Sequence, residues 1–188
     1  MCPEDSVPLT GIGEGHDLTV GSAGLSVLFD REHGVFSIRR GTREIYRFKV
    51  DDLDTNAEVL WSPNGQEFVL NYSDSGALGG FHVRVYQIDI ASDDKVTDAS
   101  RAVQGAIRDF KKRHYCKARG NNVSVLKWTA DSKGLLVMTS VYPTGDCGPD
   151  EGHAEGYVVS VPDGNIKRHL TLTQLQNYPG VCLQNDEP

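Results

Sequence analysis

The sequence predicts a mainly β protein with antiparallel sheets and one inserted amphipathic α-helix, at about residues 97–114. Runs rich in β-branched and aromatic residues recur along the chain, and turn sequences such as Ser62–Gly65 and Pro162–Asn165 separate them. Between Ala99 and His114, apolar residues instead recur every three or four positions, which is typical of a helix with one buried face.

The strands are predicted in order along the chain. Before the helix they are expected at 25–29, 35–38, 44–50, 58–61, 67–72 and 81–90. After the helix they are expected at 124–128, 135–141, 156–161 and 166–172, followed by a short helical turn at 173–178. Within 81–90 the apolar alternation changes phase between Val85 and Tyr86, which predicts a β-bulge.

The predicted helix has polar signals at both ends. Thr97 or Asp98 is expected to be its N-cap residue, because their side-chain oxygens can accept a hydrogen bond from a free backbone N–H. Lys111, Lys112 and Arg113 lie in its last turn, where cations interact favourably with the helix dipole.

Size and composition indicate one globular domain over residues 1–188. We expect an irregular N-terminal arm at 1–20 and a loose tail at 179–188. Hydrophobic residues make up 38% of the chain, which excludes wholesale disorder. No apolar run approaches the roughly 18 residues that a membrane-spanning helix needs, so no transmembrane segment is predicted.

The overall charge argues against general nucleic-acid binding. The chain carries 19 Lys and Arg against 26 Asp and Glu, for a formal net charge of −7. The segment 108–119 is locally basic, with Asp109 as its single acid. We expect this segment to be a solvated helix face, and no nucleic-acid partner is predicted.

The four cysteines, Cys2, Cys116, Cys147 and Cys182, favour an oxidising compartment and disulfide bonds. Of the three pairings that four cysteines allow, we favour Cys116–Cys147 with Cys2–Cys182. The N-terminus has no signal-peptide pattern, so we expect that an export signal has been removed and that the protein is periplasmic or secreted. The alternative is a cytoplasmic protein with free thiols.

Residues 59–70 and 126–137 match each other: a strand ending in tryptophan, then Ser or Thr, a polar turn and an apolar strand. This pattern resembles the blades of β-propellers of the TolB or WD type. The resemblance implies that Trp61 and Trp128 pack between adjacent sheets, and that the protein binds proteins or peptides. The two tryptophans are 67 positions apart, longer than a blade of about 40–45 residues. Two or three such units cannot close a ring, so a partial propeller-like stack or a two-sheet antiparallel architecture is expected.

No sequence signature of a catalytic site is present. A zinc site formed by His114, Cys116, Cys147 and His153 matches no standard spacing, and the acidic residues of 143–155 lack the alternation of a calcium-binding loop. No metal and no cofactor are therefore predicted.

The sequence thus favours a non-enzymatic protein-binding protein of the bacterial periplasm or envelope, such as an immunity protein that blocks a toxin. Binding residues are expected on the loops 73–80 and 143–155, because rigid sheets present such loops to partners. The candidates are Asp74, Ser75, Leu78, Asp146, Asp150, Glu151, His153 and Glu155. Two alternatives are a metal-dependent hydrolase that uses the acidic loop 143–155 and an accessory domain of an envelope assembly.

Overall fold

The computed structural model describes residues 24–30, 33–50, 57–73, 80–114, 121–142, 147–181 and 183. Within these ranges the chain is mainly β, as predicted, and forms three antiparallel sheets with a helix inserted between the second and the third. The predicted arm at 1–20 lies outside the described residues.

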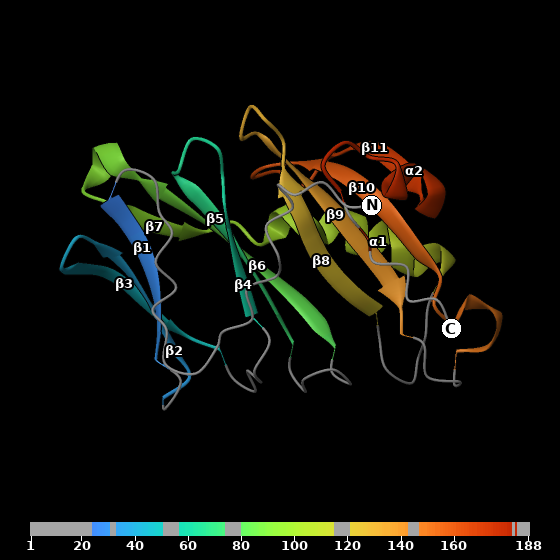
Figure 1. Ribbon diagram of the computed structural model, residues 1–188, viewed down its shortest axis with the longest axis horizontal. Coiled ribbons are helices and arrows are strands. Elements are labelled where there is room, and N and C mark those ends of the chain that lie inside the picture. Colours follow the sequence, from blue (N-terminus) through green and yellow to red (C-terminus); the bar gives the residue numbers. More distant parts are fainter. Residues whose placement is uncertain are drawn as a thin grey trace.

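Each sheet is a meander in which strands pair with their neighbours in sequence. Sheet 1 contains β1 (Leu25–Asp30), β2 (Val35–Arg40) and β3 (Arg43–Lys49). Sheet 2 contains β4 (Ala57–Trp61), β5 (Glu67–Ser73), β6 (Phe81–Asp89) and β7 (Lys95–Asp98). Sheet 3 contains β8 (Asn121–Trp128), β9 (Gly134–Val141), β10 (Ala154–Ser160) and β11 (Ile166–Thr171). Figure 1 shows the three sheets following one another across the molecule.

The helices are α1 (Arg101–Arg113) and the short α2 (Leu172–Gln176), with single 3-10 turns η3 (Ile90–Ser92) and η4 (Gly148–Asp150). The predicted helix is confirmed, but its start is shifted. Thr97 and Asp98 belong to β7, because their pairing with β6 extends the sheet to Asp98. Ser100 is the N-cap residue, and Asp98 accepts a hydrogen bond from the Ser100 backbone N–H (2.7 Å).

The turns of the two tryptophan hairpins have the same hydrogen-bond pattern. The residue after each tryptophan donates its backbone N–H across the turn, from Ser62 to Glu67 (2.8 Å) and from Thr129 to Gly134 (2.9 Å). The internal repeat in the sequence therefore corresponds to a repeat in the structure.

The side chains of these turns also match. The Ser62 hydroxyl donates to Asn64 Oδ1 (2.7 Å), and the Thr129 hydroxyl donates to Asp131 Oδ1 (2.6 Å). In both turns that oxygen also accepts the backbone N–H two residues later, a local bond that stabilises a tight turn.

Trp128 joins sheet 3 to sheet 2. Its side chain is buried, and its indole Nε1 donates to the Leu60 carbonyl on β4 (3.0 Å). Asn71 on β5 makes a second link, because its side-chain amide pairs with both the carbonyl (2.8 Å) and the N–H (2.9 Å) of Val125 on β8. The Asn71 bonds satisfy backbone groups on β8, an edge strand of sheet 3, and the Trp128 bond satisfies one on β4, an edge strand of sheet 2.

Sheets 1 and 2 meet in an aromatic cluster. The rings of Phe48 and Tyr86 lie 4.6 Å apart, and those of Phe68 and Tyr86 lie 5.0 Å apart. Val85, the neighbour of Tyr86, packs instead into the core formed by α1 and sheet 3. The predicted bulge in 81–90 is wrong: β6 pairs with β5 in unbroken register, and the phase change reflects a strand that is buried on both faces.

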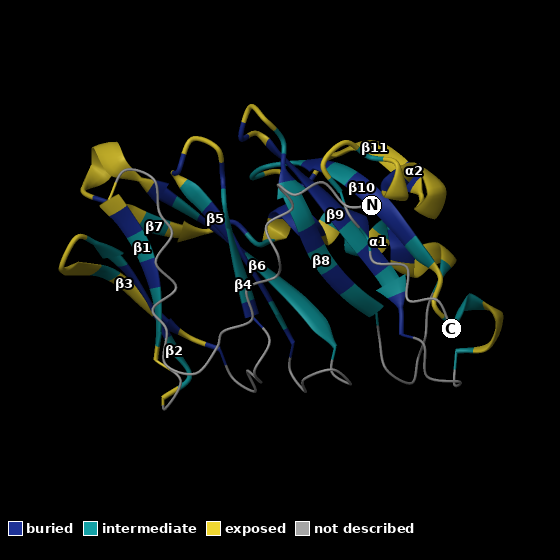
Figure 2. Ribbon diagram, viewed as in Figure 1, coloured by how far each residue is buried: buried dark blue, intermediate teal, exposed yellow. Residues whose placement is uncertain are grey.

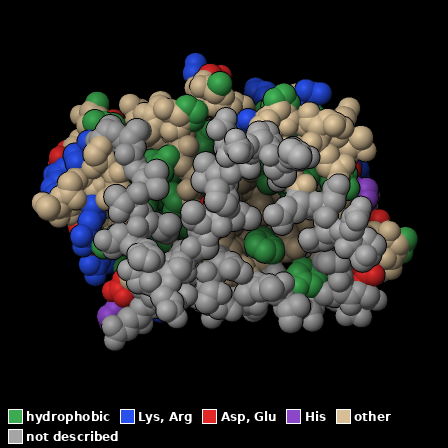
Figure 3. Space-filling model, in the orientation of Figure 1, with side chains coloured by type: hydrophobic (Ala, Val, Ile, Leu, Met, Phe, Trp, Pro, Cys, Tyr) green, Lys and Arg blue, Asp and Glu red, His purple; other side chains and the backbone are tan. Residues whose placement is uncertain are grey.

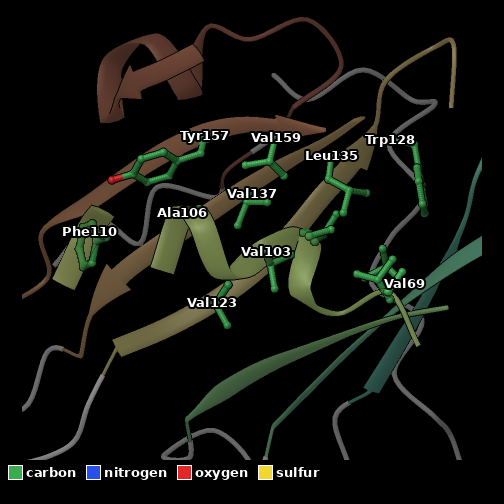
Figure 4. Close-up of a cluster of buried hydrophobic side chains, with 14 of the residues drawn as sticks. Val69, Val103, Ala106, Phe110, Val123, Trp128, Leu135, Val137, Tyr157 and Val159 are labelled. Atoms are coloured by element: carbon green, nitrogen blue, oxygen red, sulfur yellow. The ribbon is translucent and has the colours of Figure 1, made fainter. Parts of the chain in front are cut away.

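Helix α1 covers part of the sheet 3 face that also meets sheet 2. Its apolar stripe, which includes Val103, Ala106 and Phe110, packs against Val137 and Tyr157 (Figure 4). At Gly105 the helix backbone approaches the 161–165 turn so closely that an added Cβ atom would lie 2.2 Å from the Gly164 carbonyl oxygen. Figure 2 shows the resulting burial along the strands of sheet 3.

The opposite face of sheet 3 is covered by α2, which confirms the predicted helical turn after β11. Leu175 of α2 packs on Leu136 and Leu170, and a side chain at position 156 would collide with it. Val181 and Leu183 pack against the same cluster. Part of this face is therefore covered by the chain itself.

Candidate functional site

His114, His153 and Glu155 meet where α1 ends and β10 begins. His114 is the C-cap residue of α1, where its N–H donates to the Phe110 carbonyl (2.8 Å) and a φ of −135° turns the chain out of the helix. His153 directly precedes β10, and its ring stacks on that of His114 with centroids 3.9 Å apart. One nitrogen or oxygen atom from each of the three residues lies within 4.8 Å of the others.

Glu155 is the buried centre of this cluster, with 8% of its side chain exposed. Its Oε1 accepts a hydrogen bond from Arg113 Nη1 (2.6 Å), while its Oε2 accepts one from the Tyr157 hydroxyl (2.8 Å) and lies 3.1 Å from His169 Nε2. Burial raises the pKa of Glu155, but the bonds from Arg113 and Tyr157 outweigh that effect and hold the pKa at about 2. Glu155 is therefore ionised at neutral pH.

Arg113 and Tyr157 keep their protons. Burial lowers the pKa of Arg113, but its hydrogen bonds to Glu155 and Asp109 have the larger effect, so the pKa is raised overall. Asp109 lies one helical turn earlier, 2.7 Å from Arg113 Nη2. Burial and the neighbouring Glu155 carboxylate both raise the pKa of Tyr157. Both residues are thus constant hydrogen-bond donors to Glu155.

The two stacked histidines face Glu155 with the same ring nitrogen. Nε2 of His114 and Nε2 of His153 each lie 3.5 Å from Glu155 Oε1. On its other side, His114 Nδ1 lies 3.2 Å from Asp150 Oδ1, at the end of η4. The imidazole of His114 is therefore oriented between two carboxylates.

A shallow groove of about 310 Å³ lies beside the cluster. His153 and Glu155 form part of its wall, and the buried Oε1 of Glu151 has no hydrogen-bond partner. The groove is lined by Pro149, Glu151, Gly152, His153, Ala154, Glu155, Thr171 and Leu172. A second hollow, of about 400 Å³, lies between the β8–β9 turn and α2 and includes none of the three clustered residues.

The structure brings four of the predicted binding residues together: Asp150, Glu151, His153 and Glu155. The position of Glu155 corrects the prediction that it lies on the loop 143–155, because β10 begins at Ala154 and the Glu155 side chain is buried in the cluster. The other candidates, Asp74, Ser75, Leu78 and Asp146, lie outside the described residues.

Of the cysteines, only Cys147 lies within the described residues, and it is disulfide-bonded. It is therefore not a free thiolate ligand, which removes it from the zinc site considered from the sequence. Cys2, Cys116 and Cys182 lie outside the described ranges, so the proposed pairings stay predictions.

Sequence reasoning missed Arg113, Tyr157 and His169 as members of the cluster. One signal was present: Glu155 and Tyr157 are two positions apart in a strand, so they share a face. His169 pairs with Tyr157 across the β10–β11 ladder, which only the register could reveal.

Basic side chains also gather over sheet 1, at the left of Figure 3. Strands β2 and β3 carry five Lys and Arg residues. Arg40 and Arg43 bind the buried Asp94 carboxylate, and Arg47 pairs with Glu44 (2.9 Å). Much of this charge is thus neutralised within the molecule.

No family model matches this chain, and no curated protein resembles it in sequence. Neither helix within the described ranges has the length and hydrophobicity that crossing a membrane requires.

Proposed function

We propose that this protein is a non-enzymatic binding protein that holds another protein through the β9–β10 connection, residues 143–155. The observation that carries the proposal is that residues 147–154 project from the end of sheet 3 and are nevertheless held in one shape (Figure 1). Glu151 N–H donates to the Gly148 carbonyl (3.2 Å), and His153 N–H donates to the Asp150 carbonyl (3.0 Å). A surface ordered before binding loses less conformational entropy when a partner docks.

Within the neighbouring cluster, Glu155 and Tyr157 are poorly suited to acid–base catalysis. A general acid or base needs a pKa near the working pH. The pKa of Glu155 is about 2, and that of Tyr157 is raised above its ordinary value, so neither changes protonation near neutral pH.

We place the protein in the bacterial periplasm or envelope, as the sequence suggests, and the disulfide bond of Cys147 supports an oxidising compartment. The partner class that best fits an acidic projecting loop is a protein with a basic cleft, such as a toxin that an immunity protein blocks.

The test compares two charge reversals at opposite ends of β10. Glu151→Lys changes the proposed surface, whereas Asp163→Lys makes the same change in the exposed 161–165 turn. Wild-type protein on beads captures the partner from native-source extract, and the isolated partner is then titrated with each purified variant by calorimetry. We expect Glu151→Lys to weaken binding at least tenfold and Asp163→Lys to leave it unchanged. Equal binding by both variants would contradict the proposal.

A metal-dependent hydrolase is the second candidate, and one observation favours it: His153 and Glu155 both line the groove. If the protein is a hydrolase, metal-loaded protein should cleave chromogenic ester, phosphodiester or peptide substrates, and His153→Ala should abolish that activity.

An accessory role in an envelope assembly predicts instead that the protein elutes from a sizing column with a large complex in native extract.

A further inference from the structure

We propose that His114, His153 and Glu155 form a binding site for a divalent transition metal, with zinc as the preferred ion. The proposal rests on ligand geometry, on the orientation of His114 and on the donor types. It does not depend on the protein partner proposed above.

Two of the three ligand-to-ligand distances fit a bound metal ion, and the three ligand atoms lie within 4.8 Å of one another. Zinc binds histidine nitrogen and carboxylate oxygen at about 2.0–2.2 Å, so two ligands of a tetrahedral ion lie about 3.3–3.6 Å apart. Nε2 of His114 and Nε2 of His153 each lie 3.5 Å from Glu155 Oε1. This separation is long for a hydrogen bond but suits two edges of a coordination tetrahedron.

The second nitrogen of His114 has the partner that a metal-binding histidine needs. Its Nδ1 lies 3.2 Å from Asp150 Oδ1, a carboxylate that can accept the Nδ1 proton. Such a bond leaves Nε2 unprotonated and directed at the metal, and metal-ligating histidines almost always have one. Asp150 is therefore assigned as the residue that positions His114.

The remaining neighbours of Glu155 are compatible with a bound ion. Arg113 Nη1 also contacts Oε1, but its Nη2 has a separate carboxylate partner, Asp109, which it retains if the metal takes Oε1. Tyr157 holds the other oxygen, Oε2, and fixes the orientation of the carboxylate.

The donor set selects the ion. Two imidazole nitrogens and one carboxylate oxygen favour zinc or a similar first-row metal over calcium or magnesium, which prefer oxygen ligands alone. Three protein ligands leave one tetrahedral position for water or another group. His153 is 42% exposed on its side chain, so this position is accessible from the groove.

The test is calorimetric titration of tag-free, oxidised protein with zinc chloride. We expect a single site of 1:1 stoichiometry that His153→Ala weakens at least about 100-fold. Asp150→Asn should weaken zinc binding about 10- to 100-fold, as loss of a carboxylate that orients a ligand does. His33→Ala is the matched control, because His33 is an exposed histidine in the turn between β1 and β2, paired with Asp30, and its loss should leave binding unchanged.

A second readout separates a built site from surface binding. Cobalt(II) in place of zinc should produce the visible absorption of a four-coordinate ion in wild type and in His33→Ala, but not in His153→Ala. The thermal unfolding of each metal-free variant confirms that it is folded. The proposal is overturned if wild type binds no stoichiometric zinc, or if His153→Ala and His33→Ala bind it equally.

Discussion

Gly105 provides the sharpest test of how α1 sits on sheet 3. In an exposed helix, Gly→Ala increases stability by about 1 kcal/mol, because alanine has the higher helix propensity. In this protein the added methyl group would lie 2.2 Å from the Gly164 carbonyl oxygen, about 1 Å closer than ordinary van der Waals contact allows. The helix or the turn must therefore move.

The turn cannot retreat freely, because Gly164 is also closely packed. A Cβ atom at Gly164 would lie 2.7 Å from the Arg101 carbonyl oxygen, so the two backbones already touch at a second point. Moving α1 outward would separate Val103 and Ala106 from sheet 3. Overpacking of this kind costs about 1–3 kcal/mol or more, which outweighs the gain in helix propensity.

We therefore expect Gly105→Ala to lower the free energy of unfolding by up to about 2 kcal/mol, because the gain in helix propensity of about 1 kcal/mol offsets part of an overpacking cost of about 1–3 kcal/mol. Urea denaturation followed by circular dichroism measures the change. Gln104→Ala, at an exposed neighbouring position of α1, is the control and should change stability by less than about 0.5 kcal/mol. An increase of stability in Gly105→Ala would refute the close approach of α1 to the 161–165 turn.

Two further predictions concern the contacts between sheets. Trp128→Phe leaves the Leu60 carbonyl without its donor and should destabilise the protein by about 1–3 kcal/mol. Trp61→Phe should destabilise it less, because the buried Trp61 Nε1 has no hydrogen-bond acceptor. Thermal unfolding of the two variants measures the difference, and equal losses of stability would contradict the role of Trp128 in joining sheet 3 to sheet 2. Hydrogen bonds from Arg40 and Arg43 lower the pKa of Asp94 below its ordinary value of 3.8. The stabilisation that ionised Asp94 provides is therefore complete above pH 3.8 and is lost as the pH falls through the lower pKa of the folded protein. Asp94→Asn should therefore be less stable than wild type at about pH 7 and approach it at about pH 2, and a pH-independent difference in urea unfolding would exclude this linkage.

Local sequence signals predicted the elements that depend on local interactions. The spacing of Val103, Ala106 and Phe110 predicted α1, since helix periodicity places such residues on one face whatever they contact. The turn chemistry of Ser62–Gly65 predicted its hairpin for the same reason.

The errors occur where a distant partner competes with a local signal. Asp98 is a favourable N-cap type, but pairing with β6 takes it into β7. Glu155 was expected on the partner-binding loop 143–155, but it lies in β10 with its side chain buried. Arg113, 42 positions away, and Tyr157 compensate for its burial, so the carboxylate is stable inside the cluster.

By itself, the sequence determined the strand-rich class, the single amphipathic helix and the two matching tryptophan turns, because each depends on residues within a few positions of one another. Only the tertiary structure decided that α2 packs on one face of sheet 3 and that two histidines from separate elements face one buried carboxylate. Such contacts depend on strand register and on the angle of α1 against the sheet. Strand register and the angle of α1 are set by packing over the whole molecule, and they cannot be predicted from residues a few positions apart in the sequence.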